Sequence, residues 1–184
     1  GPAAVWPCST ALMSLPTDCT PDEDSAAPAA AAAPDRAVRA GVCGVAPITV
    51  YDASEQKVRL AAEVKEYRAE DFLDRREAKN LARFTQFALI AAREALADGG
   101  FSAGRADPDR CGVIVSSGIG ALGVTEEEHS RGLARGFDRV SPFYIPMTIS
   151  NMAAGQIAID SGFRGQCTCP VAACAGGTYA VGDA

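Results

Sequence analysis

Two short apolar runs constrain the fold of this chain more than any other feature of its sequence. Residues 111–116 (CGVIVS), bounded by Asp107-Pro108 and a glycine loop, predict a buried strand. Residues 167–172 (CTCPVA) are also strand-like, despite Pro170. A helical period precedes the first run, and two further helical segments separate it from the second. Strands that alternate with helices indicate an α/β fold, with layered sheets and helices and parallel strand pairing.

The helical period before the first run covers residues 71–97, where Ala88 and Ala92 fall on one apolar stripe. Gly99 and Gly100 supply a natural end for that helix. The other predicted elements are a strand over residues 58–64, a helix over residues 121–134, an irregular stretch over residues 141–146, and a helix that begins near Ser150 or Asn151 and ends around Gly162.

Residues 1–36 differ in composition from the rest of the chain. An acidic cluster at residues 22–24 is followed by an Ala/Pro run over residues 26–34. Such a segment has little apolar surface to bury, which predicts a flexible or aberrant leader. The globular domain is therefore expected to cover residues 37–184.

Charge and hydropathy exclude several classes of protein. The 184 residues include 17 basic and 23 acidic side chains, a formal net charge of −6, which argues against general binding to nucleic acid or anionic membrane. No stretch approaches the roughly 20 uninterrupted apolar residues of a membrane helix. The first residues also lack the basic and apolar regions of a secretory signal. We therefore expect a cytoplasmic protein.

The seven cysteines do not form a recognisable disulfide or metal pattern. Their number is odd and their spacing irregular, which argues against a disulfide framework. The chain has one histidine and no Cys-x-x-Cys pair, so a zinc site at Cys167, Cys169 and Cys174 is disfavoured. We expect reduced thiols and no metal.

Cys174 follows the second apolar run and precedes a segment of small residues that opens a helix. A thiol on such a turn faces the free N–H groups and the positive end of the helix, which favour the nucleophilic thiolate. The same N–H groups can bind an oxyanion when a thioester carbonyl is attacked. The alternative is that Cys174 is an ordinary buried small residue.

Five separated motifs, in register from about residue 37 to residue 184, resemble the β-ketoacyl-acyl-carrier-protein synthase family, and its type II elongating members in particular. They are residues 42–48 (VCGVAPI), 74–79 (DRREAK), 116–120 (SSGIG), 141–157 (SPFYIPMTISNMAAGQI) and 170–184 (PVAACAGGTYAVGDA).

The resemblance implies the thiolase-like layered fold, of which this chain is the first, N-terminal half, truncated after the nucleophile. It implies acyl transfer from acyl carrier protein to Cys174, followed by decarboxylative condensation with malonyl-carrier protein in fatty acid biosynthesis. The family uses no cofactor and forms homodimers. Its two histidines and lysine belong to the second half, so this chain is expected to be inactive alone. His129 is expected to be a solvated helix residue.

The resemblance also assigns secondary sites, each with an alternative. Ile119 matches the residue at the mouth of the acyl pocket, and Phe143 lies where relatives have the far end of that pocket and the dimer contact; both could instead pack in the core. Arg76 and Lys79 match positions that meet the carrier protein, although most basic runs are solvated helix faces. Gly176 replaces a Ser or Thr of many relatives, which is expected to be tolerated.

Three other interpretations stay open. The chain could belong to a polyketide ketosynthase, which a broad pocket in the second half would distinguish. It could be a non-catalytic partner, although such subunits lack the nucleophile. It could be the product of a partial gene that does not fold alone. An α/β-hydrolase is excluded, because the chain has no Gly-x-Ser-x-Gly motif.

Overall fold

The computed structural model describes residues 11–14, 43, 45–64, 67–101 and 106–184. They fall into two compact units. The first holds residues 43–68, and the second holds residues 11–14 and 69–184, each with the gaps just given.

The first unit contains a two-stranded antiparallel ladder of β2 (Val45–Pro47) and β3 (Leu60–Ala62). The Glu63 carboxylate closes its loop by accepting hydrogen bonds from the Thr49 backbone N–H at 3.1 Å and from the Thr49 hydroxyl at 2.7 Å. The strand predicted over residues 58–64 is present only in its middle. Val58 and Leu60 are exposed, so within this unit the alternating pattern buries neither residue.

The second unit is built on a three-stranded sheet in the order β1 (Ala11–Ser14), β4 (Gly112–Val115), β5 (Cys167–Thr168). β4 and β5 are parallel, with Val113 opposite Cys167, as predicted. Every residue of β4 is buried, which confirms the strand expected from its continuous apolar run. β5 ends before Pro170, which has no N–H to donate to a ladder.

β1 was not predicted. It lies within the segment that the sequence analysis assigns to a leader, and it pairs antiparallel with β4, with Ala11 opposite Val115. The antiparallel direction differs from the all-parallel pairing expected for an α/β sheet. Four residues carry too little periodicity for a strand to be recognised among the Ala, Pro and polar residues around them.

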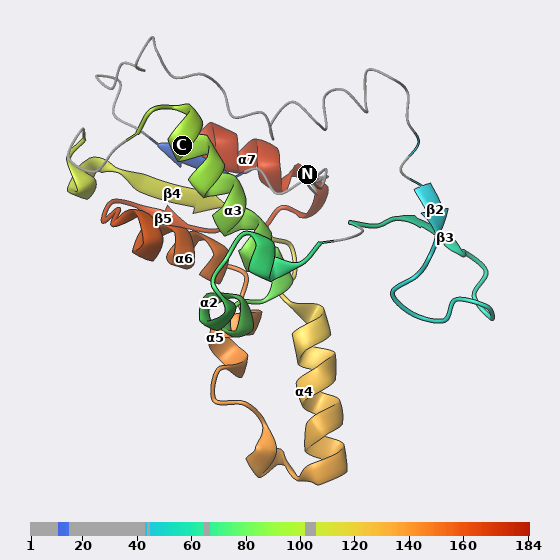
Figure 1. Ribbon diagram of the computed structural model, residues 1–184. Coiled ribbons are helices and arrows are strands. Elements are labelled where there is room, and N and C mark those ends of the chain that lie inside the picture. Colours follow the sequence, from blue (N-terminus) through green and yellow to red (C-terminus); the bar gives the residue numbers. More distant parts are fainter. Residues whose placement is uncertain (1–10, 15–42, 44, 65–66, 102–105) are drawn as a thin grey trace. The chain divides into compact units, whose positions relative to one another are not determined.

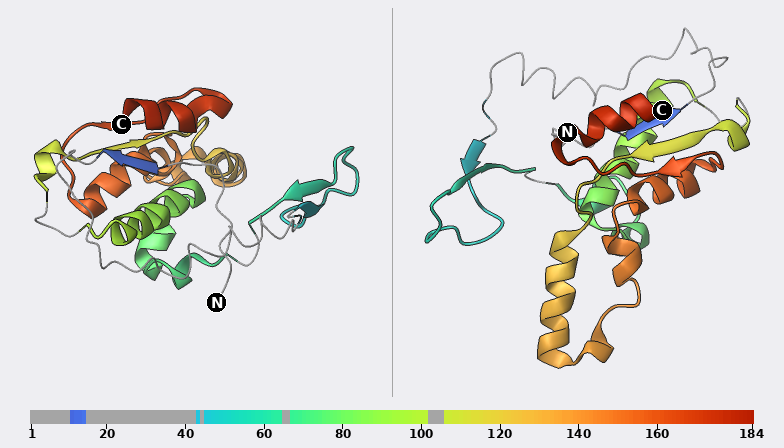
Figure 2. Two further views of the ribbon diagram at one scale, coloured as in Figure 1. Left: turned by 90° about the horizontal axis from the view of Figure 1, so that it is seen from above. Right: turned by 180° about the vertical axis from the view of Figure 1, so that it is seen from behind.

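Helices cover both faces of this sheet. Figure 1 shows α3 (Arg83–Asp98) and α6 (Met152–Ser161) on one face and α7 (Gly176–Asp183) on the other, and Figure 2 shows the same layers from above. The buried core of these layers includes Leu89, Ala92, Val113, Ile114, Ala154, Ile157 and Ala180. The layered α/β arrangement expected from the sequence is therefore confirmed in this unit.

The helical period predicted over residues 71–97 is divided between two helices, α2 (Arg75–Asn80) and α3. α2 begins at Asp74, whose carboxylate accepts the N–H groups of Arg76 and Glu77 at 2.9 Å each. The backbone then becomes extended at Leu81 and Ala82. Two carbonyls at this break, those of Ala78 and Leu81, accept hydrogen bonds from the buried amide of Gln86 at 2.8 and 2.9 Å. A side chain from the first turn of α3 thus replaces the helical bonds that the periodicity predicts.

α4 (Leu122–Arg135) confirms the helix predicted over residues 121–134, and it leads through η3 (Phe137–Arg139) to α5 (Tyr144–Thr148). The carboxylate of Glu128, which is 7% exposed, accepts the Ser141 N–H at 2.8 Å and so ties α4 to the segment before α5. The prediction of an irregular stretch over residues 141–146 is wrong for its second half. Pro146 lies in the first turn of α5, where the missing N–H costs no helical bond.

Three short 3₁₀ turns complete the second unit: η1 (Ala69–Asp71), η2 (Pro108–Arg110) and η4 (Ala173–Ala175). α6 begins after Asn151 and ends at Gly162 with φ 74°, as the sequence predicts. Within the described ranges, no helix combines the length and the apolar character needed to cross a lipid bilayer.

Candidate active site

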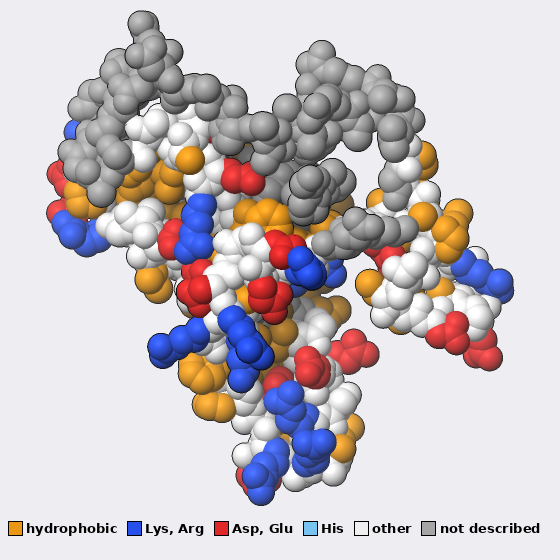
Figure 3. Space-filling view, in the orientation of Figure 1, with side chains coloured by type: hydrophobic (Ala, Val, Ile, Leu, Met, Phe, Trp, Pro, Cys, Tyr) orange, Lys and Arg blue, Asp and Glu red, His pale blue; other side chains and the backbone are white. Residues whose placement is uncertain are grey.

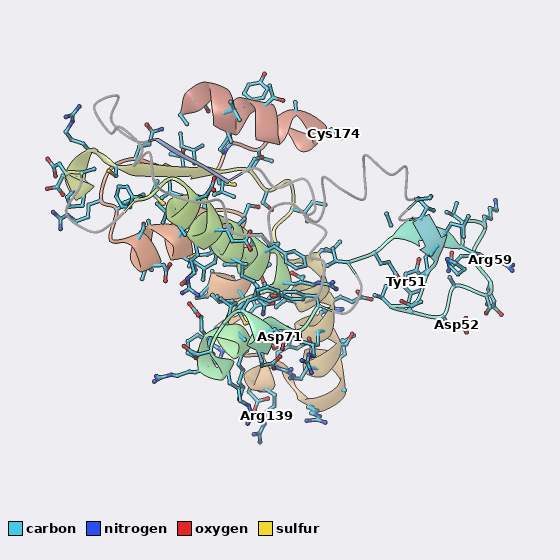
Figure 4. All side chains as sticks on the ribbon, turned by 45° about the horizontal axis from the view of Figure 1, so that its top comes forward. Tyr51, Asp52, Arg59, Asp71, Arg139 and Cys174 are labelled. Carbon is cyan, nitrogen blue, oxygen red and sulfur yellow. The ribbon has the colours of Figure 1, made fainter. Side chains whose placement is uncertain are left out.

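Cys174 lies at the centre of η4, between the end of β5 and the first residue of α7. Figure 4 shows it where the chain enters α7, and its side chain is exposed. The alternative of a buried structural cysteine is therefore wrong for this chain. Cys111, which is fully buried beside β4, has that role instead.

The backbone next to Cys174 has an unusual conformation. Among the described residues, Ala173 is the only non-glycine residue with a positive φ, at 46°. An alanine in this region costs about 1–2 kcal/mol and persists only where the surroundings impose it. The Ala175 N–H donates to the Ala172 carbonyl at 2.9 Å across the turn. The strand–turn–helix predicted around Cys174 is therefore a tight turn held by its own backbone.

The loops that follow β4 and β5 lie at the same edge of the sheet, because the two strands are parallel and adjacent. Three contacts join these loops. The Ser116 hydroxyl donates to the Pro170 carbonyl at 2.8 Å, and the Cys169 thiol lies 3.9 Å from the Ser117 carbonyl. A Cβ added at Gly176 would also lie 2.9 Å from the Ser116 Cβ and closer still to its hydroxyl. Ser116 thus leaves room only for a glycine at position 176.

Ser116 was missed by the sequence analysis as a candidate site residue. Its two contacts reach residues 54 and 60 positions further along the chain, at Pro170 and Gly176. No local pattern connects a serine at the end of a strand with a glycine that distant in sequence.

Ile119 lies in the loop after β4 and is 68% exposed. The core-packing alternative is therefore excluded for the described chain. The loop is shaped by Gly120, which has φ 74° and whose N–H donates to the Ser117 hydroxyl at 3.1 Å. The structure thus brings the loop of Ile119 to the sheet edge from which the Cys174 turn begins, while its role at an acyl pocket stays a prediction.

Phe143 lies on the other side of the sheet from α7, at the start of α5, and is 55% exposed. It lines a surface hollow of about 430 Å³ with Arg76, Glu77, Leu81 and Pro146. Ile119 and Cys174 are not among the lining residues. The structure therefore brings Phe143 together with a predicted carrier-docking residue, and does not bring it to Cys174 in the described chain.

Arg76 and Lys79 are both exposed on α2. Figure 3 shows basic side chains over the α2–α5 region with hydrophobic side chains beside them. Acidic side chains lie there as well, and the hollow that Arg76 lines also includes Asp74 and Glu77. His129 is exposed on α4, with its ring centroid 6.3 Å from that of Phe137, in agreement with the solvated helix residue expected.

Cys167, like Cys174, is exposed, whereas Cys111 is buried. Partial burial of the Cys167 sulfur raises the pKa of this thiol, so a smaller fraction of Cys167 is thiolate at neutral pH. In the part of the chain that the structure describes, no three His, Cys, Asp or Glu side chains form a group that could hold a metal ion.

Comparison with solved structures defines the fold class of this chain. A β-ketoacyl synthase from Burkholderia phymatum superposes with a TM-score of 0.62 over 82% of this chain and 38% of its own, at 22% identity. A type II PKS acyl-carrier protein in complex with its ketosynthase, bound to the hexaketide, gives a TM-score of 0.57 over 66% of this chain and 35% of that chain, at 17% identity. The second unit therefore has the fold of the N-terminal half of the thiolase-like ketosynthases.

The chain belongs to the β-ketoacyl synthase family. The family model "Beta-ketoacyl synthase, N-terminal domain" matches residues 33–184. The 3-oxoacyl-acyl-carrier-protein synthase 2 of Synechocystis is 45% identical over 141 residues, which are 77% of this chain and 34% of that protein. The chain thus spans about a third of the length of such relatives.

Proposed function

We propose that a protein carrying this chain is a condensing acyltransferase of fatty acid biosynthesis, with Cys174 as the residue that accepts the acyl group. The observation that carries the proposal is the exposed thiol on a strained turn between the parallel strand β5 and the helix α7. The names of the relatives support the fatty acid class, since 3-oxoacyl-acyl-carrier-protein synthase 2 is 45% identical, whereas the polyketide ketosynthase structure is 17% identical.

The first step is acyl transfer. The Cys174 thiol loses its proton, and its sulfur attacks the carbonyl carbon of an acyl thioester on the carrier protein. The bond between that carbon and the carrier sulfur breaks, and the carrier leaves as a thiol after it takes up a proton. The start of α7 supplies the partial positive charge that stabilises the oxyanion.

The second step joins two carbons. A malonyl thioester loses CO₂, and its α-carbon attacks the acyl carbonyl on Cys174. The carbon–sulfur bond of the acyl-enzyme breaks, which restores the thiol and releases the 3-ketoacyl product. The resemblance assigns the residues that assist decarboxylation to the second half of the family's fold. No cofactor takes part in either step.

The proposed partner is acyl carrier protein, with Arg76 and Lys79 as docking residues. Both are exposed on α2, and positive charge there would attract an acidic partner to a chain of net charge −6. Phe143 and Ile145, at the start of α5, are exposed and support a homodimer contact, because exposed large apolar side chains favour an interface. We also propose that Ile119 gates the acyl pocket, that residues 37–184 form the synthase domain behind a leader of residues 1–36, and that the protein acts in the cytoplasm.

Acylation at Cys174 tests the proposal. The protein and its Cys174→Ala variant are incubated with acyl-loaded carrier protein, and the site of any added acyl mass is located by peptide mass spectrometry. We expect the acyl group on Cys174 and no acylation of the variant. Cys169→Ala, a neighbouring thiol on the same loop, serves as the control and should still be acylated. An unmodified Cys174 in the wild-type protein refutes the proposal.

A further inference from the structure

Ser116 makes two contacts with the segment that carries Cys174, one on each side of the thiol. Before Cys174, its hydroxyl donates to the Pro170 carbonyl at 2.8 Å. After Cys174, its side chain fills the space beside Gly176, where an added Cβ would lie 2.9 Å from the Ser116 Cβ. One side chain at the end of β4 therefore contacts both ends of the nucleophile turn.

The residues between these two contacts have few other constraints. Val171, Ala173, Cys174 and Ala175 are all exposed, so packing does not hold them. Within the turn, the Ala175 N–H donates to the Ala172 carbonyl at 2.9 Å, and the Gly176 N–H bonds the Ala173 carbonyl. These bonds shape the turn but do not attach it to the sheet. The attachment comes from the strand ends at β4 and β5.

The conformation of Ala173 depends on how the turn is attached to the sheet. Its positive φ of 46° is a conformation that an alanine leaves unless its neighbours hold it. If Pro170 or Gly176 moves, the turn can relax to a common conformation and the direction of the Cys174 side chain changes. A displacement of about 1 Å in a reacting group can lower a reaction rate by about a hundredfold.

We propose that Ser116 is a positioning residue for Cys174, which holds the nucleophile turn through its bond to Pro170 and its close fit against Gly176. This inference rests on the proposed function, because positioning matters only if the thiol attacks a substrate. It extends that function by assigning a role to a residue on the neighbouring strand end, outside the turn that carries Cys174.

Ser116→Ala removes the hydroxyl, which makes the bond to Pro170 and is the atom nearest to Gly176, and keeps the Cβ. Its matched control is Ser161→Ala, because the Ser161 hydroxyl also donates to a backbone carbonyl, that of Ile157 at 2.7 Å, and lies at the end of α6 away from the turn. Ser161→Ala also loses a longer bond to the Ala158 carbonyl and the bond that its hydroxyl accepts from the Phe163 N–H. A purely structural role therefore predicts an effect of Ser161→Ala at least as large as that of Ser116→Ala.

Single-turnover acylation of Cys174 by a small acyl thioester measures the effect. For Ser116→Ala we expect a maximal rate about tenfold below that of the wild type and an unchanged half-saturating concentration, because the acyl group is still bound but the thiol is misdirected. Ser161→Ala should keep both values. Equal rates for the wild type and Ser116→Ala overturn the proposal.

The fit against Gly176 is tested by rescue. Gly176→Ala forces a Cβ against Ser116 and should lower the acylation rate about tenfold or more, or prevent folding. Ser116→Gly/Gly176→Ala removes the collision and should recover folding and a rate at least equal to that of Ser116→Ala. A double variant that is no better than Gly176→Ala contradicts the proposed fit.

Alkylation of Cys174 by iodoacetamide keeps this test separate from the proposed function. The rate at one fixed pH, read by peptide mass spectrometry, needs no acyl transfer. If the wild-type thiol is not acylated but Ser116→Ala still changes its alkylation rate severalfold relative to Ser161→Ala, the positioning role stands and the condensing function fails. If neither variant changes alkylation, the positioning role fails.

Discussion

The backbone of Gly120 lies directly against the carbonyl group of Thr148. A Cβ at position 120 would collide with the Thr148 oxygen, which already accepts the Ala121 N–H at 3.0 Å. Gly120 also has φ 74°, a conformation that only glycine adopts at little cost. The loop after β4 is therefore joined to the end of α5 by a contact that leaves no room for a side chain.

Gly120→Ala is accordingly expected to destabilise the protein by about 3 kcal/mol or more, from backbone strain and collision together. Gly118→Ala is the matched control in the same loop, since a Cβ there has no atom within 4 Å and φ is not positive. Its effect should stay within about 0.5 kcal/mol. Urea unfolding of both variants measures the difference, and equal midpoints would contradict the contact.

Arg93 joins three helices of the second unit. Its guanidinium donates to Asp160 of α6 at 2.6 Å and to Glu77 of α2 at 2.8 Å. The hydrogen bond to Asp160 is the main cause that raises the pKa of Arg93, with Glu77 adding to it. Because the three side chains are only partly exposed, we expect Arg93→Met to lower the free energy of unfolding by about 1 kcal/mol.

Arg139→Met is the control for this ion pair. Arg139 lies 3.5 Å from Asp138, and both side chains are more than two-thirds exposed, at 71% and 77%. Its loss should change the unfolding free energy by less than about 0.5 kcal/mol. Chemical unfolding at low and high salt would distinguish the two, and a salt-insensitive, negligible effect at Arg93 would show that the bridge does not stabilise the helices.

The hydroxyl of Thr148 is buried and has no hydrogen-bond partner among the described residues. A buried unsatisfied hydroxyl costs about 1–3 kcal/mol. Thr148→Val keeps the shape of the side chain and should therefore raise the melting temperature, with a gain of about 1 kcal/mol. Thr125→Val should act in the opposite direction, because the Thr125 hydroxyl accepts the Tyr144 hydroxyl at 3.4 Å. A lower melting temperature for Thr148→Val would mean that its hydroxyl is bonded in solution.

Glu94 on α3 makes stability depend on pH. Partial burial raises the pKa of its carboxyl above the unfolded value. The native state then binds the proton more readily than the unfolded state, so stability falls as pH rises from about 4.3 through the native pKa. Glu94→Gln removes this loss and should be more stable than the wild type at pH 7 by up to about 0.5 kcal/mol, and equal to it near pH 4.

Unfolding at several pH values tests the assignment to Glu94. Glu126→Gln, at an exposed position on α4, provides the control and should leave the pH dependence unchanged. If Glu94→Gln keeps the wild-type slope between pH 4 and 7, burial of the Glu94 carboxyl is not its origin.

The elements that the sequence predicts correctly have local causes. The run at residues 111–116 is apolar throughout and becomes the buried strand β4, because a continuous apolar run can be satisfied only between two covering layers. Gly99–Gly100 and Gly162 end helices, since each supplies the conformation that ends a helix. The position of Cys174 before α7 follows in the same way from a strand, a tight turn and small residues in sequence.

The incorrect predictions concern features that depend on contacts outside the local sequence pattern. The extended backbone between α2 and α3 depends on the Gln86 amide, which supplies bonds to two carbonyls at the break. The placement of Phe143 beside Arg76 depends on how α2 and α5 come together, which the spacing of apolar residues in either helix does not specify. β1 forms because β4 offers an edge for pairing.

The α/β class, the family and the place of Cys174 between a strand and a helix were thus determined by the sequence alone, because each depends on residues that are neighbours along the chain or on motifs in register. Only the tertiary structure decided that Ser116 contacts the turn of Cys174 on both sides. Residues 116 and 176 are brought together by the parallel pairing of β4 and β5 and the return of α7 over the sheet. The fit between a serine and a glycine 60 residues apart exists only once those layers have formed.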